Sequence, residues 1–124
     1  MSYIDGFVIP VPDENRTSFI EHARIFDSML LEHGALRVME CWGDSVPDGK
    51  VTDFRRAVQA GAGESVVFSW VEWPDKATRD AAHGKMEALM RSGQLDPTLT
   101  AMPFDGKRMI FGGFDPVLEL GGPR

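Results

Sequence analysis

The chain has a single cysteine, Cys41, among its 124 residues, so it cannot form an internal disulfide. This scarcity fits a reducing cytoplasm, and Cys41 lies in an apolar run, where we interpret it as a small buried hydrophobe rather than a nucleophile. No apolar run reaches the roughly 18 residues that a transmembrane helix needs. The N-terminal residues also lack the basic start and long apolar segment of a signal peptide. The sequence therefore predicts a cytoplasmic protein without a membrane partner.

Positive charge is scarce as well. Lys and Arg number 13 against 19 Asp and Glu, a net charge of −6, and the cations are scattered. Because contacts to phosphates dominate nucleic-acid affinity, we expect no nucleic-acid partner. The chain has no Cys pairs of the zinc-site type, no Gly-rich nucleotide motif and no Ser-His-Asp or Cys-His order that can be read from the sequence. We therefore assign neither a cofactor nor a metal site.

Alternating and helical periodicities predict the elements. Extended runs occur at 3–10, 35–43, 53–59, 65–73 and 108–114, with helices at 14–32 and 75–91. Pro10 and Pro12 should end the first strand, and Asp75 is a natural N-cap for the second helix. With the middle strand region long and interrupted, the order is β-α-β-β-α-β, which predicts an α+β, ferredoxin-like fold with an antiparallel sheet and both helices on one face. We expect one domain over residues 1–115 and a flexible tail over 116–124.

The strands are apolar on both alternations, although helices can cover only one face of such a sheet. In the clearest strand, Val66, Phe68 and Trp70 point one way, whereas Val67, Val71 and Trp73 point the other. A second copy of the chain is the economical cover for the free face, pairing two sheets as a dimeric α/β-barrel. The alternatives are a different protein partner or a ligand.

Charged and aromatic residues within the strands are the best pocket candidates, because burying a charge is costly unless it is paired or used. They are Glu40, Trp42, Asp53, Arg55 and Glu72, with Glu40 and Trp42 on one strand face and Asp53 and Arg55 on another. An Arg with two carboxylates at a cavity mouth would bind an acid or carry out general acid–base chemistry. The competing interpretation is an ion pair at the dimer interface.

Histidines give weaker candidates. His22 and His33 flank the apolar stripe of the first helix, where a His either ligates haem, acts as a base or bonds a backbone carbonyl. We retain His22 as a pocket candidate. Asp80, His83 and Glu87 share a helix face with the spacing of metal ligands, but that face points away from the apolar stripe, so we expect it to be solvated.

The segment "MPFDGKRMIFGGF" (Met102–Phe114) combines an Asp-Gly turn, two cations and a Gly pair. A phosphate cradle would place Gly-rich amides at the start of a helix, but here a strand follows. We interpret the segment as a turn that leads into the last strand, with an anion site at Lys107 and Arg108 as the alternative. Gly112 and Gly113 suggest a bulge or a close backbone approach.

Three segments, "ECWGDSVPDGKVTDFRRAV", "VVFSWVEWPDKATRDAA" and "MPFDGKRMIFGGF", together resemble the YbaA-like family of small bacterial proteins, a domain of unknown function. The resemblance spans Tyr3 to Phe114 and implies a dimeric α/β-barrel, but it brings no activity or catalytic residues. Two functions stay open: a cofactor-free oxygenase or isomerase acting on a small molecule in a cavity beside the sheet, or a non-catalytic ligand-binding or protein-interaction module.

Overall fold

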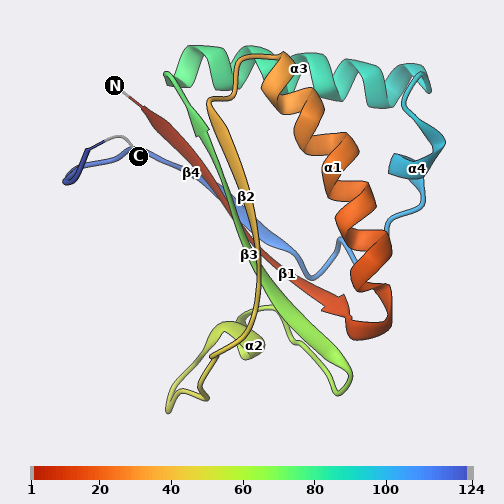
Figure 1. The fold of residues 1–124 in the computed structure, drawn as a ribbon, viewed down its shortest axis with the longest axis vertical. Coiled ribbons are helices and arrows are strands. Elements are labelled where there is room, and N and C mark those ends of the chain that lie inside the picture. Colours follow the sequence, from red (N-terminus) through yellow and green to blue (C-terminus); the bar gives the residue numbers. More distant parts are fainter. Residues whose placement is uncertain (1, 123–124) are drawn as a thin grey trace.

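Four antiparallel strands in the order β2-β3-β1-β4 form the sheet of the protein, whose computed structural model describes residues 2–122 (Figure 1). The elements in chain order are β1 (Tyr3–Pro12), a 3-10 turn η1 (Asp13–Asn15), α1 (Arg16–Glu32), β2 (Arg37–Trp42), α2 (Phe54–Ala57), β3 (Glu64–Trp73), α3 (Lys76–Ser92), α4 (Pro97–Thr100) and β4 (Ile110–Phe114). Helices α1 and α3 lie on one side of the sheet (Figure 1). The predicted ferredoxin-like order is therefore confirmed. Residues 1 and 123–124, including the end of the expected tail, lie outside the described part.

The first strand continues through both prolines instead of ending at Pro10. β1 pairs with β3 along its whole length but with β4 only from Ile4 to Val8. The amide of Asp13, just after β1, donates to the Gly63 oxygen on the β3 side. Because the direction of the backbone N–H alternates along a strand, the even-numbered residues of β1 point their nitrogens toward the β4 side. β4 does not extend beyond Val8, so no neighbouring strand needs an N–H from Pro10 or Pro12. The sheet therefore tolerates both prolines.

The expected strand over 53–59 is wrong, because this segment forms the one-turn helix α2. Asp53 is its N-cap, and its carboxylate accepts hydrogen bonds from the amides of Arg56 at 2.7 Å and Gly49 at 3.0 Å. Such capping satisfies amides that a single helical turn otherwise leaves unpaired. β3 therefore has no strand partner in this segment and pairs with β2 and β1.

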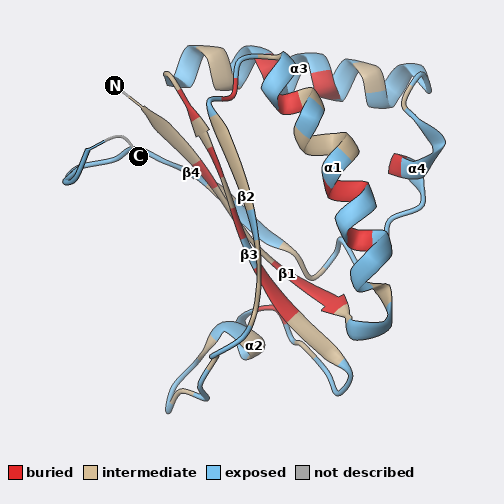
Figure 2. Ribbon diagram, in the orientation of Figure 1, coloured by how far each residue is buried: buried red, intermediate tan, exposed pale blue. Residues whose placement is uncertain are grey.

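The core lies between the sheet and the two long helices (Figure 2). One buried cluster joins α1, α3 and β3 around Trp73 and Leu30, and a second joins α1 to β1 and β3 around Phe19 and Val11. Asp75 caps α3 by accepting from the Thr78 amide at 2.7 Å, as predicted. None of the helices within residues 2–122 combines the length and apolar character that crossing a bilayer requires.

Candidate functional site: a carboxyl pair in an apolar cavity

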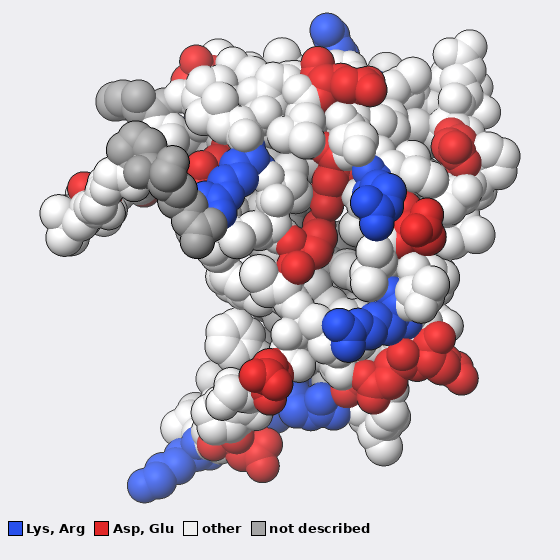
Figure 3. Space-filling model, viewed as in Figure 1, with Lys and Arg blue, Asp and Glu red and all other residues white. Residues whose placement is uncertain are grey.

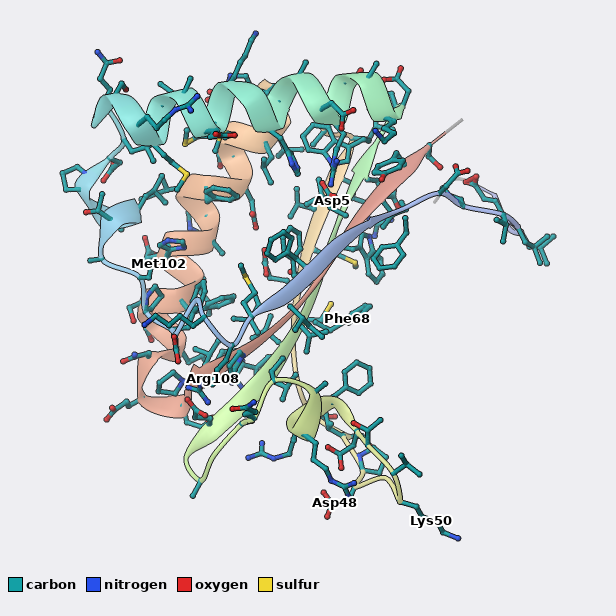
Figure 4. The ribbon with its side chains drawn as sticks, turned by 180° about the vertical axis from the view of Figure 1, so that it is seen from behind. Asp5, Asp48, Lys50, Phe68, Met102 and Arg108 are labelled. Carbon is teal, nitrogen blue, oxygen red and sulfur yellow. The ribbon has the colours of Figure 1, made fainter. Side chains whose placement is uncertain are left out.

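A cavity of about 240 Å³ lies on the helix-covered side of the sheet, between the two core clusters. Helix α1 and the sheet provide most of its wall, and the segment from Met90 to Met109 closes its side. Figure 4 shows Met102 from this segment beside α1. The apolar lining consists of Phe7, Ile9, Phe19, Ala23, Phe26, Leu30, Val71, Met90, Met102, Phe104 and Met109. An apolar cavity of about 150 Å³ holds one benzene ring, so this one has room for a larger ring compound.

Four polar residues also line the cavity: His22 and Asp27 from α1, Glu40 from β2 and Ser69 from β3. Ser69 is 2% exposed and lies directly across the strand pair from Glu40. Asp27 and Glu40 also line a groove on the outer flank between α1 and β2. Figure 3 shows acidic side chains gathered in that groove. The pair thus joins the interior cavity to solvent, and part of Glu40 remains exposed at the mouth.

The carboxyl groups of Asp27 and Glu40 are hydrogen-bonded to each other. Burial raises the pKa of Asp27 to about 9, and the hydrogen bond and the charge of Glu40 add to this shift. Burial also raises the pKa of Glu40, while hydrogen bonds from Asp27 and Ser69 oppose the increase by favouring the charged form. Because two adjacent carboxylates cannot both ionise without a large repulsion, Asp27 keeps its proton near neutral pH.

His22 is 9% exposed and packs among aromatic rings. Its ring stacks on Phe26, with 6.5 Å between centroids, and meets Phe104 edge-on at 5.9 Å. Burial lowers the pKa of His22, and a hydrogen bond with the Leu99 backbone only partly opposes this. The histidine is therefore neutral at pH 7, and it brings no positive charge to the acidic pair.

A second charged cluster lies under α3, where Asp5 is 2% exposed. Its carboxylate accepts hydrogen bonds from Trp73 Nε1 at 2.9 Å and from Arg79 Nη2 at 2.9 Å, and His83 Nε2 lies 2.9 Å away. Figure 4 shows Asp5 on the side of the sheet that faces α3. These contacts fasten α3 to the sheet and satisfy the buried Asp5 carboxylate.

The opposite face of the sheet carries a recess of about 510 Å³ whose lining is almost wholly apolar. Phe68, Ile110 and Phe114 are 42%, 45% and 60% exposed there. Figure 4 shows Phe68 directed away from the helices. In Figure 1 the chain after β4 and the loop that carries α2 both extend on this side, so they flank the recess. We call this surface the outer face.

The predicted pocket residues do not assemble into one constellation. Glu40 and His22 reach the cavity, whereas Trp42 packs against Phe19 further along the same face, with Arg16 at 5.2 Å over its ring. Glu72 pairs in register with Ile4, which places it on the same side of the sheet as the outer face but outside the lining of the recess.

Asp53 and Arg55 do not share a strand face, because the strand expected there is α2. Hydrogen bonds from the amides of Arg56 and Gly49 hold the pKa of Asp53 below its usual range. Arg55 donates to the backbone oxygens of Glu64 and Gly61, both at 2.8 Å. Both side chains therefore stabilise the 43–63 connection.

The sequence interpretation missed Asp27 and Ser69, although a signal for each exists. Asp27 follows Ala23 by four residues and precedes Leu30 by three, so it belongs to the buried stripe of α1. Ser69 lies between Val67 and Val71 in the row of β3 side chains that faces the helices. A polar side chain in a buried register is the feature that marks both.

The remaining candidates have local roles. His33 Nδ1 lies 2.7 Å from the Met29 carbonyl oxygen. Of the three roles considered for this histidine, the structure therefore shows the bond to a backbone carbonyl. Asp80 and Glu87 form ion pairs with Lys76 and Arg91, whereas His83 contacts Asp5 and is not simply solvated. Within residues 2–122, no three His, Cys, Asp or Glu side chains gather as a metal site. Cys41 is free and half-buried.

The segment 102–114 is a turn that leads into β4. Arg108 is held by Glu64, with Nη2 2.7 Å and Nη1 2.8 Å from its two carboxylate oxygens, and by Asp105 at 3.0 Å. These contacts with Arg108 contribute most to lowering the pKa of Glu64 to about 2. Gly113 is required by a close approach: a Cβ there would lie 2.9 Å from Arg79 Nη2 and even nearer to the Tyr3 hydroxyl. The close backbone approach predicted at this Gly pair is therefore present at Gly113.

Comparison with known proteins identifies relatives but no activity. A family model described as "Protein of unknown function (DUF1428)" matches residues 2–106. Two relatives, both named uncharacterized protein YbaA, come from Escherichia coli (strain K12) and Shigella flexneri. Each is 50% identical over 119 residues, which cover 96% of this chain and 99% of the relative. The predicted resemblance to the YbaA-like family is confirmed.

Among solved structures, a dimeric ferredoxin-like protein from an uncultured marine organism is similar in fold. Its TM-score is 0.57 at 13% identity, with 97% of this chain and 100% of that chain covered. This likeness supports the ferredoxin-like fold of the chain and carries nothing about its chemistry.

Proposed function

Since the chain belongs to the DUF1428 family of proteins of unknown function, we propose from its own geometry that it is a homodimeric small-molecule enzyme whose ligand occupies the helix-side cavity. The observation that carries this proposal is a pair of carboxyl groups, Asp27 and Glu40, in contact with each other at the wall of a mostly apolar cavity. A non-catalytic interaction module would have no use for such a pair, because desolvating carboxyl groups lowers stability.

The cavity wall indicates the kind of ligand. Aromatic rings and methionine side chains surround it, and a neutral His22 adds no charge. Methionine and aromatic walls suit flat, uncharged ring compounds, which make dispersion contacts without requiring a counter-ion. The ligand class is therefore an uncharged compound of one or two rings that carries a polar group able to reach the Asp27–Glu40 pair.

Binding of 2-tetralone, a neutral two-ring ketone, tests the site by saturation-transfer NMR and calorimetry. We expect saturable binding to the native protein, weakened at least about tenfold, or about 1.4 kcal/mol, by Ala23→Met, which fills the cavity from α1. Met102→Trp narrows the cavity from the opposite segment and should act in the same direction. Ala88→Met on the exposed side of α3 is the matched control. Equal binding by the filled and native proteins would refute the site.

A second copy of the chain is the proposed cover for the outer face. The support is the exposure of Phe68, Ile110 and Phe114 in one recess, and the absence of a charged side chain among the described residues that line it. A large exposed apolar surface of this kind marks an interaction site. Being uncharged, the surface is complementary to itself across a two-fold axis. The similar fold described as dimeric supports the same arrangement.

Light scattering after gel filtration tests the dimer. We expect the native chain to elute with twice the mass of one chain, and Phe68→Glu to elute as a folded monomer because it would bury a charge at the interface. Leu31→Glu is the control, since Leu31 is 49% exposed on α1, away from the outer face. A native chain that stays monomeric at micromolar concentration contradicts the dimer but leaves the cavity proposal intact.

A further inference from the structure

We propose, resting on the ligand site above, that Asp27 and Glu40 together move a proton between carbon and oxygen of a bound enolisable ketone, so that the protein is a cofactor-free keto–enol isomerase. Asp27 is the acid that faces the carbonyl oxygen of the ligand, and Glu40 is the base that takes the proton from the adjacent carbon. The relevant substrates are uncharged ring compounds with an enolisable ketone.

The first support is that the pair presents an acid and a base to the same cavity. The two groups come from different elements, α1 and β2, and both line the cavity and the groove beside it. When Glu40 is ionised beside protonated Asp27, one carboxyl is a donor and the other an acceptor. Enolisation needs both functions at once, because the carbonyl oxygen gains negative charge as the C–H bond breaks.

Ser69 determines which carboxyl is the base. Ser69 lies directly opposite Glu40 on β3, and its hydroxyl opposes the increase in the pKa of Glu40 by favouring the charged form. The causes that act on Asp27 all raise its pKa, so Asp27 retains the proton. A neutral carboxylic acid in an apolar site is a strong hydrogen-bond donor to a developing enolate.

The charges around the pair favour a neutral substrate. His22 lines the same cavity in its neutral form. Arg24 lines the outer groove on the far side of the pair and lies 3.9 Å from Glu21, with both side chains exposed to solvent. Among the described residues, the cavity itself is lined by no Lys or Arg. An anionic substrate would therefore meet the negative charge of the carboxyl pair without a compensating cation.

The proposed step is balanced without any further reactant. Glu40 takes the proton from the α-carbon, the C–H electron pair forms the C=C bond, and the carbonyl π pair moves to oxygen. That oxygen takes the proton of Asp27, which gives the enol. Reversal returns a proton to carbon, and the pair recovers its starting state by transfer across its own hydrogen bond. An oxygenase would need dioxygen as a co-reactant, whereas this step needs only the residues present.

Deuterium exchange at the C1 position of 2-tetralone in D₂O, followed by proton NMR, tests the inference. Exchange with the native protein should be faster than in buffer alone at the same pH. Asp27→Asn and Glu40→Gln should each reduce the protein-dependent exchange rate by about 10²–10⁴-fold. Both variants keep the cavity, so both should still bind the probe. Asp48→Asn, which changes an exposed carboxyl at the loop tip in Figure 4, should exchange at the native rate.

The outcomes separate the two proposals. Binding without exchange above buffer overturns the isomerase and leaves the ligand site standing, whereas absence of saturable binding overturns the ligand site as well. A purely structural role for the pair would predict the same loss of stability and of rate in each variant. The proposed role instead predicts a bell-shaped pH dependence of exchange, which falls when both carboxyl groups are protonated and when both are ionised.

Discussion

The two faces of the sheet differ in where they place polar groups. The helix-covered face buries Asp5 and Ser69 and directs Asp27 and Glu40 into one cavity, whereas the outer face exposes phenylalanine and isoleucine with almost no polar surface. Burying a polar group costs free energy, and exposing a large apolar surface invites association. The comparison therefore supports the proposed chemistry on the first face and the proposed assembly on the second.

Replacing one tryptophan from each face of β3 tests this division most strongly. Trp73 is fully buried and donates to Asp5 at 2.9 Å, so Trp73→Ala should lower the free energy of unfolding by about 3–5 kcal/mol. Trp70→Ala on the outer face should leave the fold of the monomer intact and weaken the dimer. Urea unfolding and light scattering at matched protein concentration measure the two effects. Equal loss of stability in both variants contradicts the division.

Neighbouring glycines of β4 give a second matched pair. A Cβ at Gly113 would collide with Tyr3 and Arg79, so Gly113→Ala should cost about 1–3 kcal/mol of stability. A Cβ at Gly112 meets only the Phe114 ring at 3.5 Å, an ordinary contact on the outer face, so Gly112→Ala should change stability by about 0.5 kcal/mol or less. Thermal unfolding distinguishes them, and a reversed order would show that the faces are misassigned.

A pH series sharpens the comparison, because the outer recess has no titratable group in its described lining. The folded pKa of Asp27 is raised above its unfolded value of about 4, so its folded state holds the extra proton and stability falls as pH rises from about 4 to about 9. Asp27→Asn should remove that decline and raise stability at pH 8 by about 1–2 kcal/mol. An unchanged slope in the variant contradicts the assignment.

Glu64 should show the opposite dependence at acid pH. Its folded pKa of about 2 lies below its unfolded value, so the stability it contributes is present above about pH 4 and is lost as pH falls toward 2. Arg108→Ala removes the main cause and should flatten this acid limb without changing the decline above pH 4. Chemical unfolding at a series of pH values measures both limbs in one protein.

The smallest effect should be that of salt on the dimer. Raising NaCl from about 50 mM to about 500 mM shortens the Debye length severalfold but weakens an apolar interface hardly at all. We expect the dimer dissociation constant to change by no more than about twofold. A strong weakening by salt, measured by sedimentation, would indicate that charged residues outside the recess dominate the interface.

Much of the fold was predictable because it follows from local patterns. Alternation predicted β3, Asp75 predicted the start of α3, and apolar residues on both alternations predicted a sheet with no polar face. The strand predicted over 53–59 was wrong. The Asp53 carboxylate, which accepts from the amides of Arg56 and Gly49, stabilises a single helical turn that the sequence pattern does not distinguish from a strand.

The sequence by itself determined the two layers, the helix-facing stripe of α1 and the uncovered outer face, since each depends on the spacing of apolar residues along one segment. Only the tertiary structure brought Asp27 of α1 to Glu40 of β2 and Ser69 of β3. Their proximity depends on how α1 crosses the sheet and on the register of β2 against β3. No local pattern fixes those distances, and the contact between the two carboxyl groups depends on them.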